Sequence, residues 1–288
     1  MKSLAAALKH SYKAAAFDVD GTLTPFARWI VPDSLKEALR SIPINIPLAI
    51  CSGRSFDYAR TKLEHILDGQ FLDEAQKRRW FLICENGGVL YRYNARKKDY
   101  EMVFEVPWPD QELTQETMEA FIRDKFGWHV QFVLRPHSLV VRFHDWLYVF
   151  PRLVSIVSHR TGNQIRTLFK KMGHDKHFMV EDSGIGNLII PAASGKGKAI
   201  EKWAKHLGIA VQDILVVGDQ AQPGGNDEEL LSGNYGVPFS VGKLTKSNHP
   251  FPVLDPKGRH LKGPEGTEYL LRKVFSLDQD LPPTKPRD

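Results

Sequence analysis

The first ninety residues alternate short apolar runs with segments of helical periodicity. Apolar residues dominate positions 14–20, 46–52 and 80–84, and helical spacing of apolar residues separates them over 34–42 and 55–67. Short apolar runs are typical of strands that are buried on both faces, and the helices between them supply the crossovers of a parallel sheet. This part of the chain therefore predicts an α/β fold.

The same alternation returns near the C-terminus. The pattern predicts, in order, a helix over 196–207 that ends at Gly208, a strand over 214–219, a short helix from Asn226, a strand over 235–241 and a helix over 267–275. Both ends of the chain therefore contribute elements to one predicted parallel sheet.

The middle of the chain has a different pattern. It predicts an antiparallel pair over 129–145 that turns at Pro136–Ser138, a helix over 147–161, a strand over 164–169 and a hairpin over 177–192 that turns at Ser183–Gly186. We therefore expect residues 93–190 to form an inserted α+β domain, with residues 1–92 and 191–288 forming a discontinuous core.

The composition is that of a globular protein, with 42% hydrophobic and 25% charged residues. The longest apolar runs, such as 46–51, fall far short of the roughly 18 residues that span a bilayer, so no membrane association is expected. Charged residues interrupt the apolar N-terminus, which argues against a signal peptide and predicts a cytoplasmic location. Cys51 and Cys84 lie inside apolar runs and are expected to be buried, without disulfide or zinc. Nothing in the sequence indicates an oligomeric state.

The net charge of +5 is concentrated in the middle of the chain. Residues 125–176 hold nine lysines and arginines against two acids. Such a segment is either a solvated basic face or an attraction for an anionic substrate or partner. Because aromatic residues are not clearly interleaved with the basic ones on one sheet face, the pattern favours a small anion over nucleic acid.

Polar residues and glycines stand at the ends of the predicted core strands. They are Asp18 to Thr22, Ser52 to Arg54, Glu85 to Gly88, and Gly218 with Asp219. The carboxyl ends of parallel strands meet at one edge of a sheet, so these groups are expected to converge on one crevice. Carboxylates close together in a poorly solvated place are costly unless a cation compensates, and an all-oxygen set suits Mg²⁺.

Four stretches resemble, in the right order, the four motifs of the haloacid dehalogenase superfamily: Asp18–Thr22, Ser52, Lys196 in "SGKGKAI", and "GDQAQPGGND" over 218–227. The resemblance covers 10–92 and 191–275. The insert is similar to the α/β cap of the subclass that includes Cof-type sugar phosphatases, sucrose-phosphate phosphatase and eukaryotic phosphomannomutase. The resemblance implies a Rossmann-like parallel-sheet core with an inserted cap domain.

The resemblance also implies roles for single residues. Asp18 would be the nucleophile that forms an aspartyl-phosphate, and Asp20 the general acid and base. Ser52 would bind the phosphoryl oxygens, and Lys196 would offset the charge between nucleophile and phosphate. Mg²⁺ would be held by the Asp18 carboxylate, the Asp20 backbone carbonyl and Asp219.

Some of these residues have alternative interpretations. Asn226 and Asp227 would orient Lys196 and metal-bound water, yet both also fit an ordinary helix start. Ser52 also fits a helix cap. Lys198 competes with Lys196, although the family's pattern of lysine, glycine, any residue, alanine and an aliphatic residue matches Lys196 to Ile200.

Substrate contacts are expected from strand ends and from the cap. The candidates for substrate binding are Ser52, Gly53, Arg54, Asn86, Arg135 and Arg142. Selectivity for the leaving group is expected in the cap, because cap closure excludes bulk water. The candidates there, at or near hairpin ends, are Arg135, Arg142, His144, Glu181 and Asp182.

The predicted function is a Mg²⁺-dependent phosphatase acting on a small phosphorylated metabolite, with a sugar phosphate as the expected substrate. A phosphosugar mutase is the alternative, because "FDVDGTLTP" and "PGGND" resemble phosphomannomutase. Against it, the arginine-rich stretch of that family's cap is missing. An alternative of another class is a non-catalytic protein that binds sugar phosphate or nucleic acid.

Overall fold

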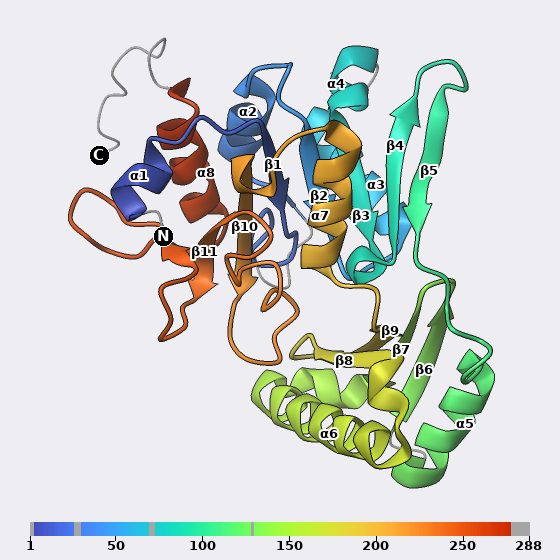
Figure 1. The fold of residues 1–288 in the computed structure, drawn as a ribbon. Helices are drawn as coiled ribbons and strands as arrows, with labels where there is room; N and C mark the ends of the chain where they lie inside the picture. Colours follow the sequence, from blue (N-terminus) through green and yellow to red (C-terminus); the bar gives the residue numbers. More distant parts are fainter. Residues whose placement is uncertain (1–2, 26–29, 69–72, 128–129, 278–288) are drawn as a thin grey trace.

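The computed structural model describes residues 3–25, 30–68, 73–127 and 130–277. Two sheets organise this part of the chain: an eight-stranded sheet of order β12-β11-β10-β1-β2-β3-β4-β5 and a four-stranded sheet of order β6-β7-β9-β8 (Figure 1). The smaller sheet lies below the larger one in the view, beyond the lower ends of its strands.

The large sheet is parallel from β12 to β3, and β4 and β5 extend it with antiparallel pairing. Its strands are β1 (Ala14–Phe17), β2 (Leu48–Cys51), β3 (Trp80–Cys84), β4 (Val89–Asn94), β5 (Asp99–Glu105), β10 (Ile214–Gln220), β11 (Val237–Lys243) and β12 (Phe251–Pro252). The α/β fold is confirmed, with strands where the apolar runs predicted them.

Helices cover both faces of the large sheet. The helices of the chain are α1 (Leu4–Leu8), α2 (Asp33–Ser41), α3 (Phe56–Leu67), α4 (Glu74–Arg79), α5 (Gln115–Phe126), α6 (Pro151–Met172), α7 (Lys196–Leu207) and α8 (Gly263–Val274). Ala15 and Phe17 pack in the core with α2, α3 and α8, while Ala14 and Ala16 face α7. Alternate residues of β1 therefore serve two cores, as expected of a strand buried on both faces.

The four-stranded sheet is built from two hairpins with a core of its own. Its strands are β6 (Val130–Arg135), β7 (Ser138–Phe143), β8 (Phe178–Asp182) and β9 (Asn187–Pro191). The α5 and α6 helices pack against it. Both predicted hairpin turns are confirmed, at 136–137 and 183–186. This sheet with α5 and α6 is called the cap below.

The helix predicted over 147–161 is present from Pro151 onward as part of α6, whereas the strand predicted over 164–169 is wrong, because α6 runs without interruption to Met172. Ile165 and Phe169 lie four residues apart, so they fall on one side of this helix and pack into the cap core. The short apolar run that suggested a strand is therefore one face of a long helix.

The predicted start of the insert at residue 93 also differs from the strand pairing. β5 pairs with β4, so the large sheet extends to Glu105. The division into core and cap domains stays a proposal. Among the described helices, none combines the length and the apolar character needed to cross a bilayer.

Candidate active site

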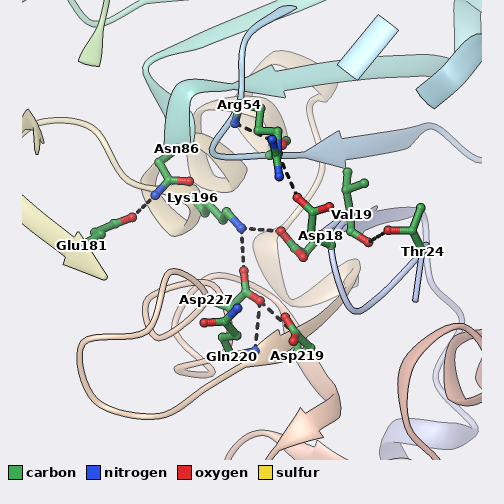
Figure 2. Close-up of polar contacts among 12 residues, drawn as sticks. Asp18, Val19, Thr24, Arg54, Asn86, Glu181, Lys196, Asp219, Gln220 and Asp227 are labelled. Atoms are coloured by element: carbon green, nitrogen blue, oxygen red, sulfur yellow. Dashed lines mark hydrogen bonds and ion pairs between the residues drawn. The ribbon is translucent and has the colours of Figure 1, made fainter. Parts of the chain in front are cut away.

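A buried ion-pair network lies at the carboxyl end of β1. The Lys196 ammonium lies 2.6 Å from Asp18 Oδ1 and 2.6 Å from Asp227 Oδ1 (Figure 2). The lysine and Asp227 are both fully buried, and Asp18 is 3% exposed. Such short charge-assisted contacts fix three side chains from three separate elements in one arrangement.

Lys196 reaches these carboxylates because it is the first residue of α7, directly after Gly195. Gly195 has a φ of +139°, and a Cβ there would lie 2.0 Å from the Glu229 carboxylate. That carboxylate accepts a 3.0 Å hydrogen bond from the Gly197 amide in the first turn of α7. Lys198 instead donates to the Ala192 carbonyl at 2.6 Å, so of the two competing lysines Lys196 is the one at the site.

The loop after β10 folds back onto its own strand. Asp227 Oδ2 accepts hydrogen bonds from the Asp219 amide at 3.0 Å and the Gln220 amide at 3.2 Å (Figure 2). Gly218 permits this approach, because a Cβ there would lie 2.8 Å from Asp227 Oδ2. The loop forms turns rather than the helix predicted from Asn226. Asp227 therefore belongs to a strand-end loop, not to a helix start.

Three of the acids form a set that fits a hard cation. Oxygens of Asp18, Asp219 and Asp227 lie within 4.8 Å of one another. Asp18 Oδ2 and Asp219 Oδ1 are buried without a hydrogen-bond partner in the described part of the chain. Gly21, with a φ of +89°, lets the Asp219 carboxylate approach to 2.4 Å from where a Cβ would stand. An all-oxygen set with unpartnered carboxylate atoms suits Mg²⁺.

The shifted pKa values of these groups also indicate a cation site. Burial and the neighbouring Asp227 charge raise the pKa of Asp18 to about 7, against the opposing effect of Lys196. Burial, Asp227 and Asp18 raise the pKa of Asp219 to about 9. Burial opposes the charge of Lys196, but the two carboxylates raise its pKa well above the ordinary value. One ammonium group does not offset three acids, which leaves negative charge for a cation to neutralise.

Asp20 lies outside this network. Its carboxylate accepts hydrogen bonds from Arg54 Nε at 3.1 Å and from the Tyr58 hydroxyl at 2.9 Å. The turn after β1 holds the backbone here, since the Gly21 amide donates to the Thr24 carbonyl at 2.9 Å. Asp18 and Asp20 therefore have separate partners, and the assignment of the Asp20 backbone carbonyl to the metal stays a prediction.

The loop after β2 brings Ser52 and Gly53 to the same edge. Ser52 is 2% exposed, and its hydroxyl accepts from the Arg54 amide at 3.1 Å. The N-cap of α3 is Ser55, not Ser52. A Cβ at Gly53 would lie 2.7 Å from the side-chain oxygen of Asn86, so this loop and the loop after β3 are in close contact.

Asn86 links the core to the cap. It lies in the loop after β3 with a φ of +51°, and its amide nitrogen donates to the Glu181 carboxylate of β8 (Figure 2). Its side-chain oxygen is buried and has no hydrogen-bond partner among the residues described. Burial raises the pKa of Glu181 to about 8, with Lys196 opposing the rise.

The turn between β6 and β7 is fastened to the core. Arg135 Nη1 donates to the Gly53 carbonyl at 2.9 Å. Glu85 accepts from the His137 amide at 3.1 Å and from the Ser138 hydroxyl at 2.7 Å. Sequence reasoning gave Glu85 only as part of a strand end. The sequence signal for Glu85 is its position directly after a wholly apolar strand, because a carboxylate buried there requires hydrogen-bond partners.

The β8–β9 hairpin contacts the core through its backbone. The Asp182 amide donates to the Gly224 carbonyl at 3.1 Å, in the loop that carries Asp227. The Asp182 carboxylate points into the cap, where Ser158 Oγ donates to it at 2.6 Å. The side chain of Asp182 is therefore turned away from the crevice.

Two cap candidates lie elsewhere. Arg142 contacts Asp145 at 3.6 Å and the ring of Tyr148 at 5.7 Å, at the end of β7 remote from the turn that holds Arg135. His144 contacts Gln131 at 3.0 Å. The structure thus does not bring Arg142 and His144 to the crevice, because their positions along the strand separate them from the β6–β7 turn.

Tyr58 is the residue at this site that sequence reasoning missed. It lies in the first turn of α3, and Arg54 lies in the loop before that helix, so the two side chains reach Asp20 from different elements. No local pattern in the sequence indicates this, because it depends on α3 lying opposite Asp20.

Comparison with known proteins finds similarity to phosphatases. The family model described as sucrose-6F-phosphate phosphohydrolase matches residues 160–242. A phosphoglycolate phosphatase of Archaeoglobus fulgidus is 30% identical over 210 residues, covering 72% of this chain and 75% of that protein. An HMP-PP phosphatase of Yersinia pestis is 26% identical over 238 residues, covering 77% and 81%.

Solved structures share the fold. An IMP-bound IMP-nucleotidase of Plasmodium falciparum has a TM-score of 0.67 at 14% identity, covering 94% of this chain and 71% of that one. A Synechocystis sucrose-phosphatase, in complex with sucrose and phosphate, has a TM-score of 0.54 at 19% identity, covering 81% and 83%. Both likenesses support a Rossmann-like core with a cap.

Proposed function

The chain belongs to the haloacid dehalogenase superfamily of phosphatases, and we propose that it is a Mg²⁺-dependent phosphomonoester hydrolase whose substrate is a sugar phosphate. The observation that carries the proposal is the ion pair of Lys196 with Asp18 and Asp227, which leaves Asp18 Oδ2 buried without a partner in the described chain. A fixed carboxylate with one uncommitted oxygen is the arrangement that a nucleophile requires.

The proposed reaction has two steps. Asp18 Oδ2 attacks phosphorus in line and forms an aspartyl-phosphate, while Asp20 gives a proton to the departing alkoxide. Water then attacks the phosphorus, Asp20 takes the proton, and the Asp18 carboxylate is released with inorganic phosphate. Lys196 holds Asp18 in place and offsets the charge that builds up between carboxylate and phosphoryl oxygens.

Asp18 and Asp219 would hold Mg²⁺, with Asp227 beside them and the Asp20 carbonyl as the further predicted ligand. When bound, the cation neutralises negative charge on the acids and on the phosphoryl oxygens. Asn226, whose side-chain oxygen is buried without a described partner, would orient water at this edge together with Asp227.

The substrate would lie between the strand ends and the cap. Ser52 and Gly53 would receive the phosphoryl group, with Arg54 and Arg135 close to the Gly53 loop. The free acceptor oxygen of Asn86 suits a hydroxyl group of the leaving alcohol. A hydroxyl-bearing sugar would satisfy this acceptor, which supports a sugar phosphate as the substrate.

The test measures phosphate release from sugar phosphates, phosphoglycolate and nucleotides, in Mg²⁺ and in EDTA. We expect Mg²⁺-dependent release from sugar phosphates, and a loss on the order of 10⁴-fold for Asp18→Asn. Asp145→Asn, which changes a 91% exposed acid paired with Arg142 at the far end of β7, should retain activity.

Three outcomes would contradict parts of the proposal. Turnover by Asp18→Asn would exclude the covalent step, and full activity in EDTA would exclude the metal. Isomerisation of mannose 1-phosphate in the presence of a hexose bisphosphate, without phosphate release, would identify a mutase instead.

A further inference from the structure

Both carboxylate oxygens of Asp20 are held from α3 and the loop that precedes it. The Tyr58 hydroxyl donates to Oδ1 at 2.9 Å, and Arg54 Nε donates to Oδ2 at 3.1 Å. The Asp20 side chain is 36% exposed, unlike that of Asp18 at 4%. Without partners, a carboxylate at this exposure would sample several rotamers, so these two contacts set where it points.

Tyr58 is itself fixed in place. The Arg54 guanidinium lies 4.6 Å from the centre of its ring, and the Lys62 ammonium lies 5.3 Å from it. Lys62 lies one helical turn after Tyr58 in α3, whereas Arg54 lies in the loop before the helix, so the ring is contacted from both the helix and the loop. These contacts restrict the motion of the Tyr58 ring, so its hydroxyl holds Asp20 Oδ1 in one position.

The two partners of Asp20 differ in what they can do during proton transfer. A guanidinium only donates hydrogen bonds, so it can bond only the carboxylate oxygens that carry no proton. When Oδ2 carries the proton for the leaving oxygen, Oδ1 still accepts a hydrogen bond, so the Tyr58 hydroxyl keeps donating to it. Tyr58 can therefore stay in contact with Asp20 before and after each proton transfer, whereas Arg54 is also expected to contact substrate.

We propose that Tyr58 is a positioning residue that aims the Asp20 carboxyl group at the leaving oxygen of the substrate. The inference rests on the proposed function, in which Asp20 is the acid and base. It predicts a role only where the leaving group needs a proton: an alkyl phosphate such as a sugar phosphate depends on it, and p-nitrophenyl phosphate, with a good leaving group, does not.

The test compares kcat and KM of Tyr58→Phe on the best sugar phosphate and on p-nitrophenyl phosphate. We expect kcat to fall about tenfold on the sugar phosphate and less than about twofold on the aryl phosphate, with KM unchanged. Asp20→Asn should show the same pattern with a larger loss, and adding Tyr58→Phe to it should cause no further loss.

Tyr100→Phe is the matched control. The Tyr100 hydroxyl is buried without a hydrogen-bond partner in the described ranges. Its ring, on β5, lies 5.4 Å from the ring of Phe56, which belongs to the same helix as Tyr58. Removing this hydroxyl should leave both substrates unaffected. Urea unfolding of each variant checks that the fold is intact.

The possible outcomes distinguish a failure of the role of Tyr58 from a failure of the acid role of Asp20. Equal losses of Tyr58→Phe on both substrates, wild-type kcat on both, or losses that add to those of Asp20→Asn would overturn the role of Tyr58. If Asp20→Asn itself shows no dependence on the leaving group, the acid role in the proposed function fails instead.

Discussion

The candidate site has two sides that are built from different contacts, and they are called the floor and the roof here. The floor consists of Asp18, Lys196 and Asp227, whose buried charges hold one another, and of Asp219, whose backbone amide donates to Asp227. The roof consists of Arg135, Glu181 and the backbone at Asp182, each held by a hydrogen bond to a core loop. The floor is one coupled unit, whereas the roof is a set of separate contacts.

The difference indicates where each property of the enzyme lies. A coupled, buried network tolerates no single change, because any lost partner leaves an unpaired charge in a poorly solvated place. Separate contacts on two hairpin turns can change one at a time. We therefore expect the chemistry to depend on the floor and the choice of substrate to depend on the roof.

The largest effect is expected from breaking the floor. Lys196→Met leaves the carboxylates of Asp18 and Asp227 without their ammonium partner, which should lower the free energy of unfolding by about 3–5 kcal/mol and abolish turnover. Urea denaturation and phosphate release measure the two effects. Added Mg²⁺ should restore part of the stability, because the cation takes over the neutralising role.

Lys198→Met is the control. It removes the same charge two residues further along α7, from a lysine that donates to backbone carbonyls and not to the carboxylates of the site. It should retain turnover. Wild-type phosphate release by a folded Lys196→Met variant would show that the ion pairs of Lys196 are not needed for activity.

A smaller effect, confined to the roof, is expected from pH. Burial raises the pKa of Glu181 from 4.5 to about 8, so the native state keeps a proton that the unfolded state loses. The stability that this proton contributes is complete below pH 4.5 and is lost as the pH rises through 8. Glu181→Gln should remove about 2 kcal/mol of the decline in unfolding free energy between pH 6.5 and 8.5.

Urea unfolding at the two pH values measures this decline. Glu112→Gln, at a half-exposed residue in the loop before α5 that pairs with His177, should keep the wild-type decline. An identical decline in Glu181→Gln would mean that Glu181 titrates as it does in the unfolded chain.

The smallest effect separates the two cap arginines. Arg135→Ala loses the contact to Gly53 at the crevice and should raise KM about tenfold, with a lesser change in kcat. Arg142→Ala removes the same charge from the far end of β7 and should change neither constant by more than about twofold. Equal effects of the two variants would mean that the roof acts through its overall charge.

The sequence by itself determined the parallel strands β1, β2, β3, β10 and β11 and the motifs at their ends, but not the antiparallel extension by β4 and β5. Apolar runs encode strands that are buried on both faces, and the ends of parallel strands share one edge, so Asp18, Ser52 and Asp219 could be placed together without coordinates. Lys196 followed from a resemblance, and its contact with Asp18 supports that assignment. These inferences depend only on local pattern and on general properties of parallel sheets.

Only the tertiary structure decided which cap residues face the crevice and how Asp20 is held. The contact of Arg135 with Gly53 joins residues 82 positions apart, and that of Asn86 with Glu181 spans 95. Tyr58 gained its role because α3 packs beside the turn after β1. Local periodicity reports the burial of a residue but not its distant partner, because docking between separate elements is set by the packing of the whole chain.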